Sequence, residues 1–118
     1  MELQDAIEFC LLLPEVKEET PFGPEVLVYK VAGKMFATAR VKDENGDMNL
    51  KCNPERAIEL RDEWEAIEPG YHMNKKHWNT LVFEGCLSRD LGRELILHSY
   101  DLVVQGMSQK LREKIPKR

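Results

Sequence analysis

The sequence predicts a two-layer α+β domain, in which helices pack against one antiparallel five-stranded sheet and the elements follow the order α-β-β-β-α-β-β-α. Apolar residues spaced by three and four positions near both ends predict helices. Between them, short stretches rich in β-branched and aromatic residues, separated by tight turns, predict strands. The length of 118 residues suits one hydrophobic core, so residues 1–118 are expected to form a single domain.

The first helix is predicted near the start of the chain. Its apolar face consists of Leu3, Ala6, Ile7, Cys10 and Leu11, and Pro14 ends it. Residues 15–24 are charged at first and then read Thr20-Pro21-Phe22-Gly23-Pro24. Because two prolines and a glycine oppose regular structure, this segment is predicted to be a loop.

Three strands are predicted next, as a meander. Residues 26–31 and 35–41 are joined by a tight turn around Ala32-Gly33-Lys34, which is typical of a hairpin. A second turn is predicted within residues 43–47, because Asn45-Gly46 tolerates the positive φ that such a turn requires. In the third strand Met48, Leu50 and Cys52 alternate with polar residues, which predicts one buried and one exposed face.

A second helix is predicted from Asn53, the N-cap, and Pro54, the first helical residue. Its inward face is expected to hold Ala57, Leu60 and Trp64, so that Trp64 is largely buried. Two further strands are predicted at residues 66–68 and 79–84, with a long connection between them that contains no acidic residue from position 71 onward.

The last long helix is predicted after Ser88, its N-cap, with Gly106 placed as the C′ residue. Its inward face is expected to consist of Leu91, Leu95, Ile96, Ser99, Leu102 and Val103, with Tyr100 buried beside them. A short basic helix is predicted to follow from Ser108.

Composition and targeting signals indicate a soluble cytoplasmic protein. Hydrophobic residues make up 42% and charged residues 32% of the chain, and the longest apolar run, Phe9 to Leu13, is too short to cross a membrane. Glu2 and Asp5 stand where a secretory signal would be basic. The three cysteines, Cys10, Cys52 and Cys86, are odd in number and irregularly spaced, so we expect reduced thiols that lie mostly in the core.

The charge is unevenly distributed. The net charge is −4, but residues 71–83 carry +2 and residues 107–118 carry +4, which leaves −10 on the rest of the chain. Binding to a polyanion would therefore depend on these two acid-poor segments.

One long motif resembles the signature of the MmcQ/YjbR family, in which a PGYHxNKxHWxTV pattern recurs. Here it reads Gly70-Tyr71-His72-Met73-Asn74-Lys75-Lys76-His77-Trp78-Asn79-Thr80, with Leu81 at the final Val position. Four other stretches agree with the resemblance: Pro21-Phe22-Gly23, Gly33-Lys34-Met35-Phe36-Ala37, Asn49-Leu50-Lys51-Cys52 continuing into Pro54-Glu55, and Ser99-Tyr100-Asp101-Leu102-Val103. The resemblance implies a YjbR-like, secretion-chaperone-like fold in a small bacterial cytosolic protein, and a proposed DNA-binding role through a double wing of β-hairpins.

The candidate binding residues follow from this motif and from the basic tail. They are His72, Asn74, Lys75, Lys76, His77 and Trp78, with Lys110, Arg112 and Lys114. Ammonium groups pair with phosphate oxygens, and aromatic rings stack on bases, so these residues could bind nucleic acid or another anion. An alternative is that His72 and Trp78 pack to hold a long loop while the lysines are solvated.

Catalytic and metal-binding chemistry is not indicated. His72 and His77 are five residues apart, which lacks the i, i+4 spacing of a helical metal site, and no second pair supplies further ligands. No base is placed near Cys52 or Cys86 by the sequence, and Gly33 and Gly46 stand alone rather than in a phosphate-binding loop. We therefore expect no catalytic residue, metal or cofactor.

Three functions remain open. The first is a non-catalytic nucleic-acid-binding domain with weak, salt-dependent affinity for DNA, although the predicted wing tip carries Asp43, Glu44 and Asp47 against Lys42 alone. The second is a protein-interaction or chaperone-like adaptor that offers a sheet face or edge to a partner. The third is a small anionic-ligand binder that uses the loop around His72 as the rim of a pocket.

Overall fold

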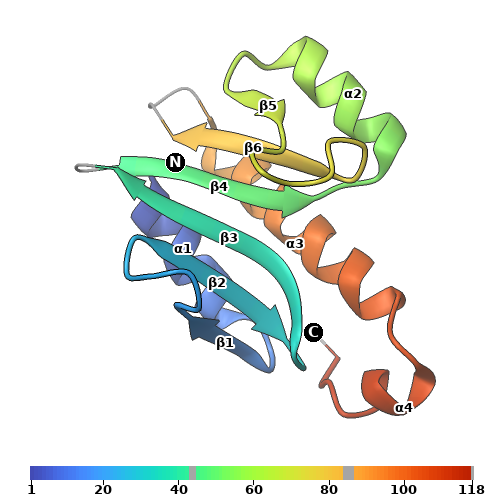
Figure 1. The fold of residues 1–118 in the computed structure, drawn as a ribbon. Coiled ribbons are helices and arrows are strands. Elements are labelled where there is room, and N and C mark those ends of the chain that lie inside the picture. Colours follow the sequence, from blue (N-terminus) through green and yellow to red (C-terminus); the bar gives the residue numbers. More distant parts are fainter. Residues whose placement is uncertain (43–44, 84–86, 118) are drawn as a thin grey trace.

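The computed structural model describes residues 1–42, 45–83 and 87–117, and within them it forms a six-stranded antiparallel sheet and four helices (Figure 1). The elements are α1 (Leu3–Leu12), β1 (Val16–Glu19), β2 (Val26–Val31), β3 (Lys34–Lys42), β4 (Asn45–Lys51), α2 (Pro54–Glu63), β5 (Ile67–Pro69), β6 (Trp78–Phe83), α3 (Arg89–Gln105) and α4 (Gln109–Arg112). The strand order is β1-β2-β3-β4-β6-β5. The predicted α+β class is confirmed, whereas the predicted number of five strands is wrong.

One face of the sheet is covered by α1 and α3, while α2 lies beside β5 and β6 (Figure 1). Within the described residues no helix covers the opposite face, which is toward the viewer in Figure 1; we call it the open face. Among the described residues, none of the helices is both long enough and apolar enough to cross a membrane.

The additional strand, β1, falls in the segment that was predicted to be a loop. It pairs antiparallel with β2, with Val16 opposite Val31 and Glu19 opposite Val28. Glu15 adopts a left-handed φ of 61°, which turns the chain directly after α1. Strand β1 lies at the edge and is largely exposed, and three of its four residues are charged. Charged edge strands lack the alternation by which strands are recognised.

The hairpin between β2 and β3 forms as predicted, and it contains a β-bulge that was not predicted. Ala32 and Gly33 both have positive φ, 48° and 82°, as a type I′ turn requires. Tyr29 pairs with Ala37 but Lys30 pairs with Met35, so Phe36 is the extra residue. Phe36 and Ala37 are both fully buried in the core, and the side chain of Met35 projects from the open face.

The second predicted turn is wrong at Asn45 and Gly46, since both belong to β4. Gly46 pairs with Val41 on one side and Phe83 on the other, and its φ is not positive. Asp47, expected at a wing tip, is also within β4 and is 8% exposed. Asp43 and Glu44 lie outside the described residues.

The α2 and α3 N-caps form as predicted, while several predicted inward residues are less buried than expected. Asn53 accepts hydrogen bonds from the N–H groups of Glu55 and Arg56. Trp64 is the C-cap of α2 and is only half-buried, because the chain leaves the helix there. The other residues that depart from the predicted pattern are Leu11, which is exposed, and Leu91 and Leu102, which are half-buried.

The C-terminal helices begin at the predicted residues, whereas the predicted end of α3 differs in detail. Ser88 caps α3 and Ser108 caps the short basic helix α4. Gly106 ends α3 with a φ of −79°, so it is a C-cap in the right-handed region rather than a left-handed C′ residue.

Polar contacts hold α3 against the sheet and against the segment that follows α1. The hydroxyl of Ser99, which is completely buried, donates to the carbonyl of Phe36 at 2.6 Å and accepts from the N–H of Lys51 at 2.8 Å. The carbonyl of Phe36, the bulge residue, is therefore hydrogen-bonded to helix α3. Tyr100, buried as predicted, packs edge-on against Phe36 and donates to the carbonyl of Pro14 at 2.7 Å.

Cys10 and Cys52 are buried free thiols, and Cys86 lies outside the described residues. Burial raises the pKa of Cys10 to about 12 and also raises that of Cys52. Both sulfurs are therefore protonated and unreactive at neutral pH.

Candidate functional site

The segment 70–77, which connects β5 to β6, is held tightly on the open face of the sheet. Tyr71 donates its backbone N–H to the Thr80 hydroxyl at 2.9 Å, and its carbonyl accepts from the Asn49 side chain at 3.1 Å. The Lys75 ammonium donates to the carbonyl of Gly70 at 2.9 Å. Asn49 and Thr80 face each other across β4 and β6, so the sheet itself positions the loop.

The other side of this loop is bound by α2. Arg61 donates to the side chain of Asn79 at 2.7 Å and to the carbonyl of Lys75. Asn79, which is 2% exposed, donates in turn to the carbonyl of Ala57. These contacts fix the loop, and they include the ammonium of Lys75, which the alternative interpretation left to solvent.

The remaining loop residues divide between backbone support and solvent. Asn74 accepts the N–H of Lys76 at 2.9 Å with its side chain, and its carbonyl accepts the N–H of His77. The carbonyl of His77 accepts the N–H of Cys52 at 2.8 Å. Trp78 begins β6 and is half-buried, whereas the side chain of Lys76 is exposed.

The two predicted basic clusters do not meet. Lys110 and Arg112 lie on α4, at the lower end of the molecule in Figure 1, and Lys114 follows it, whereas the β5–β6 loop lies beside β6 in the upper half. The nine candidate residues therefore do not form one continuous basic surface.

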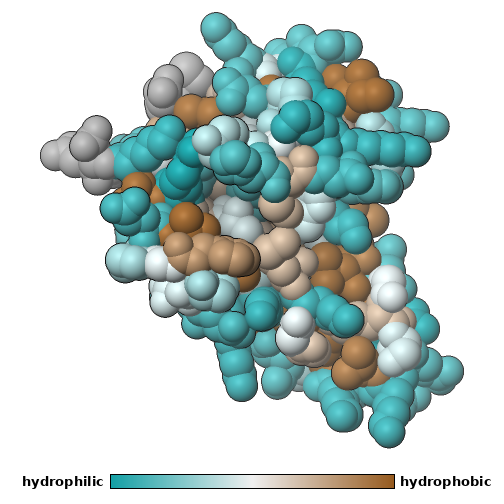
Figure 2. Space-filling model, in the orientation of Figure 1, coloured by the Kyte–Doolittle hydropathy of each residue, from teal (hydrophilic) through white to brown (hydrophobic). Residues whose placement is uncertain are grey.

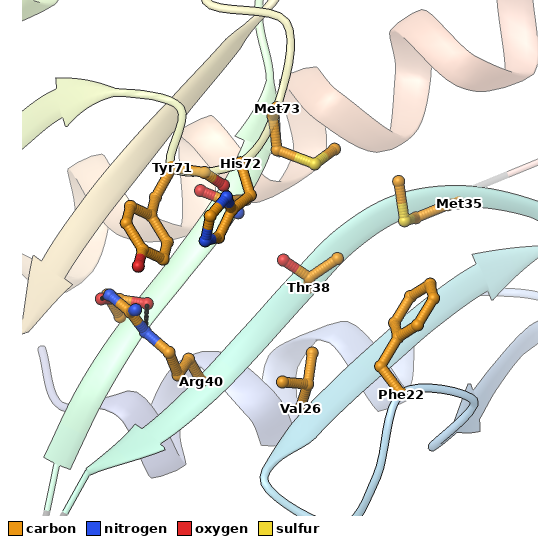
Figure 3. Close-up of a pocket in the computed structure, with 10 residues that line it drawn as sticks. Phe22, Val26, Met35, Thr38, Arg40, Tyr71, His72 and Met73 are labelled. Carbon is orange, nitrogen blue, oxygen red and sulfur yellow. Dashed lines mark hydrogen bonds and ion pairs between the residues drawn. The ribbon is translucent and has the colours of Figure 1, made fainter.

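A cavity of about 390 Å³ lies on the open face, between the loop and the segment 20–25 that connects β1 to β2 (Figure 3). Its lining consists of Phe22, Val26, Met35, Thr38, Arg40, Asp47, Asn49, Tyr71, His72 and Met73. Strands β2, β3 and β4 supply the floor, and the two connecting segments supply the walls. The bulge at Phe36 contributes directly, because it places Met35 on the same face as Thr38 and Arg40.

The polar end of the cavity is a fixed stack of charged and aromatic groups. Arg40 donates from Nε and Nη2 to the two carboxylate oxygens of Asp47, at 3.3 and 2.5 Å. The guanidinium carbon lies 4.2 Å from the ring centre of Tyr71, and this ring lies 4.1 Å from that of His72. The hydrogen bond to Asp47 is the main cause that raises the pKa of Arg40, against the opposing effect of burial. A cation–π contact with Tyr71 further orients the guanidinium.

His72 occupies the left-handed region, with a φ of 57°. A residue with a side chain pays about 1 to 3 kcal/mol in conformational energy for this backbone geometry, and such residues concentrate at functional sites. The hydrogen bonds of Tyr71 on one side and the contact between the Met73 N–H and the Gly70 carbonyl on the other fix the geometry. His72 is thereby held at the cavity wall.

The two walls carry exposed aromatic rings. Phe22 is 74% exposed and Tyr71 is 48% exposed. Figure 2, which shows the open face, has apolar side chains gathered around its centre within a mostly hydrophilic surface. Large exposed aromatic side chains facing one hollow are typical of a binding site.

Among the described residues, no group of three or more His, Cys, Asp or Glu side chains is arranged to hold a metal ion. The donors in the cavity are instead those that bind organic ligands: a guanidinium, a phenol, an imidazole and a hydroxyl.

A family model described as YjbR matches residues 11–102 of the chain. The chain belongs to the YjbR family. Two relatives from Escherichia coli, both named as uncharacterized proteins, match over almost the whole length. YbdF of strain O157:H7 is 36% identical over 112 residues, covering 95% of this chain and 92% of YbdF. YjbR of strain K12 is 25% identical over 113 residues, covering 96% of each chain.

Two solved structures share the fold of this chain. Protein DR2400 of Deinococcus radiodurans is 36% identical with a TM-score of 0.89, and the match covers 97% of this chain and 88% of DR2400. A Pseudomonas syringae protein is 26% identical with a TM-score of 0.76, covering 87% of this chain and 99% of that protein.

Residues 99–103, one of the five segments that carry the resemblance to the YjbR family, lie in α3, and the other four segments converge on the cavity. They supply Phe22, Met35, Asn49, Tyr71, His72 and Met73 to its lining. Of the nine residues predicted to bind a ligand, only His72 lies there. The prediction was based on positive charge, whereas the shared feature of these four segments is that they face one cavity. Arg40 and Asp47 lie outside these segments, and their pairing follows only from strand register.

Proposed function

We propose that this chain is a non-catalytic binding domain that holds a small, planar and largely apolar molecule between the segments 20–25 and 70–77. The observation that carries this proposal is the cavity of about 390 Å³ with exposed aromatic rings, Phe22 and Tyr71, on its opposite walls. Its size falls within the range of about 300 to 1,000 Å³ that is usual for small-molecule sites.

The composition of the lining supports an apolar occupant. Val26, Met35 and Met73 contribute aliphatic and thioether surface beside Phe22. Methionine side chains adapt to the shape of a ligand and make favourable contacts with aromatic rings. A ring inserted between the walls would remove the exposed surface of Phe22 from water, which is the main source of binding free energy at such sites.

The alternatives have weaker support. Binding to DNA stays a prediction: the two basic clusters lie far apart, and Lys75 is already bonded to the Gly70 carbonyl. An adaptor that adds a partner strand would use an edge of the sheet, but the edge strand β5 has only three residues and ends in Pro69, and β1 has only four residues, of which three are charged. Charges on an edge strand oppose the addition of another strand.

The proposal can be tested by titrating one- and two-ring aromatic fragments into ¹⁵N-labelled protein and following amide shifts. We expect shifts confined to the segments 20–26, 35–40, 47–49 and 71–73. The variant Phe22→Ala should bind about tenfold more weakly, because it loses the stacking surface of one wall. Leu12→Ala is the matched control, since Leu12 is 80% exposed on α1 and lines no part of the cavity. If no fragment shifts these amides, the proposal is wrong.

A further inference from the structure

The cavity has two chemically different ends. Figure 3 shows Arg40, Tyr71 and His72 together on one side, and Phe22 and Met35 on the other, with Thr38 between them. A ligand that satisfies both ends must carry a flat apolar part and one polar group. The identity of the polar group depends on whether the polar end presents donors or acceptors.

The polar end presents donors. Both carboxylate oxygens of Asp47 are bonded to Arg40, and the Asp47 side chain is 12% exposed whereas that of Arg40 is 29% exposed. A guanidinium carries five N–H groups, so donors remain on Nη1 and Nη2 after Asp47 has taken its two. The accessible charge is therefore the positive charge of Arg40, which would bind an acceptor oxygen of the ligand.

The number of charges limits the ligand further. Arg40 is the one cationic side chain that lines the cavity among the described residues, and Asp47 already neutralises part of its charge. A phosphate dianion would remain under-compensated, and an ammonium group would face the guanidinium. A planar carboxylate matches the geometry of the guanidinium, and a charged acceptor forms a stronger hydrogen bond than a neutral one.

We propose that the ligand class is an aromatic monocarboxylate, with its ring between Phe22 and the two methionines Met35 and Met73, and its carboxylate at Arg40 beside Tyr71 and His72. This inference rests on the proposed function, because it assumes that the cavity binds a small molecule. To the proposed apolar ligand it adds one polar group, the carboxylate.

Three probes with the same ring system test the inference: 2-naphthoate, 2-naphthamide and naphthalen-2-ylmethylammonium. Each is titrated into the ¹⁵N-labelled parent at low salt, following the amides of Val26, Thr38 and Met73. We expect 2-naphthoate to bind about tenfold more tightly than 2-naphthamide, since a charged acceptor replaces a neutral one, and the ammonium to bind most weakly.

The outcomes separate this inference from the proposed function. If 2-naphthamide or the ammonium binds as tightly as 2-naphthoate and shifts the same amides, the carboxylate inference is wrong and the cavity still binds aromatic molecules. If none of the three probes shifts these amides, both the inference and the proposed function are contradicted.

A pair of variants assigns the selectivity to Arg40. Arg40→Met alone would leave Asp47 buried without a partner, so the double variant Arg40→Met/Asp47→Leu is used, which removes both charges together. It should bind 2-naphthamide like the parent but lose the tenfold preference for 2-naphthoate.

The second variant is His72→Gly, which suits the left-handed φ of this position and should fold. It should weaken 2-naphthoate binding about threefold through loss of the imidazole. An unchanged preference in both variants would overturn the assignment, and Leu12→Ala again serves as control.

Discussion

At the scale of single residues, two positions favour glycine because neighbouring atoms approach the backbone too closely to leave room for a side chain. A side chain on Gly46 would place its Cβ 1.9 Å from the carbonyl oxygen of Arg40, and a side chain on Gly70 would place it 2.8 Å from the Cβ of Trp78. Gly46 thus allows β3 to pack closely against β4 near the Arg40–Asp47 pair, and Gly70 allows the loop to begin directly against β6. Both glycines support the cavity without lining it.

Gly46→Ala should lower the free energy of unfolding by about 2 to 3 kcal/mol, because the atom it would meet is backbone and the strands must separate to admit the methyl group. Gly106→Ala is the control. There the nearest atoms are at 3.5 and 3.6 Å and φ is −79°, so alanine fits and should change stability by no more than about 0.5 kcal/mol. Urea unfolding of the three proteins gives the comparison. Equal stability of the two variants would contradict the close approach at Gly46.

A second residue-scale prediction concerns His98, whose Nε2 accepts the N–H of Asn53 at 3.1 Å. Burial, followed by the charge of Arg56, lowers the pKa of His98 below its ordinary value of 6.5, while Asp101 and Glu94 oppose the shift. The unfolded chain therefore binds the proton more readily than the folded one. The stability that neutral His98 provides is present above about pH 6.5 and is lost as pH falls from there through the folded pKa.

Urea unfolding at pH 8 and pH 5.5 measures this effect. The parent should be less stable at pH 5.5, and His98→Gln, which keeps an acceptor but does not titrate, should show a smaller difference between the two pH values. His77→Gln is the control, because the contacts of His77 are made by its backbone. If His98→Gln keeps the full pH dependence of the parent, His98 is not its source.

At the scale of secondary-structure elements, the sequence predicted those whose pattern depends on burial or on caps. Helix α2 was recognised from Asn53 and Pro54, and the β2–β3 hairpin from its turn. Strand β1 was missed because an exposed edge strand needs no alternating pattern. The bulge at Phe36 was missed because it depends on the partner strand and on Ser99, which is 63 positions away in the chain.

The contact between α3 and the bulge gives an element-scale prediction. Ser99→Ala should destabilise the protein by about 2 to 3 kcal/mol, because it leaves the buried carbonyl of Phe36 and the N–H of Lys51 without their shared partner. Ser108→Ala is a matched control, since Ser108 caps the short exposed helix α4 and should cost about 1 kcal/mol or less. Thermal or urea unfolding separates the two. A loss at Ser99 no larger than that at Ser108 would show that water replaces the hydroxyl.

At the scale of the whole molecule, the cavity combines five parts of the chain: segments 20–25 and 70–77 and strands β2, β3 and β4. None of these parts carries a recognisable binding motif alone. The sequence did reveal the segments by resemblance, and His72, one of the candidate binding residues, lines the cavity. It could not reveal that Arg40 meets Asp47 and Tyr71, since that depends on the pairing of β3 with β4 and on how the loop folds back over them.

The distribution of charge over the molecule leads to a prediction about DNA. The chain has a net charge of −4, and its two basic segments belong to separate parts of the fold, the β5–β6 loop and the region of α4. Any binding of a labelled duplex should therefore be weak and involve few phosphates, and it should disappear between about 20 and 150 mM salt as counterion release loses its contribution. Fluorescence anisotropy at the two salt concentrations measures this binding.

Two lysine variants test where the duplex binds. Lys76→Ala should reduce the low-salt binding, because Lys76 is exposed in the acid-poor loop, while Lys17→Ala, on the acidic edge strand, should not. Saturable binding that persists at 150 mM salt and depends on Lys76 would favour nucleic acid over a small ligand as the partner of this face.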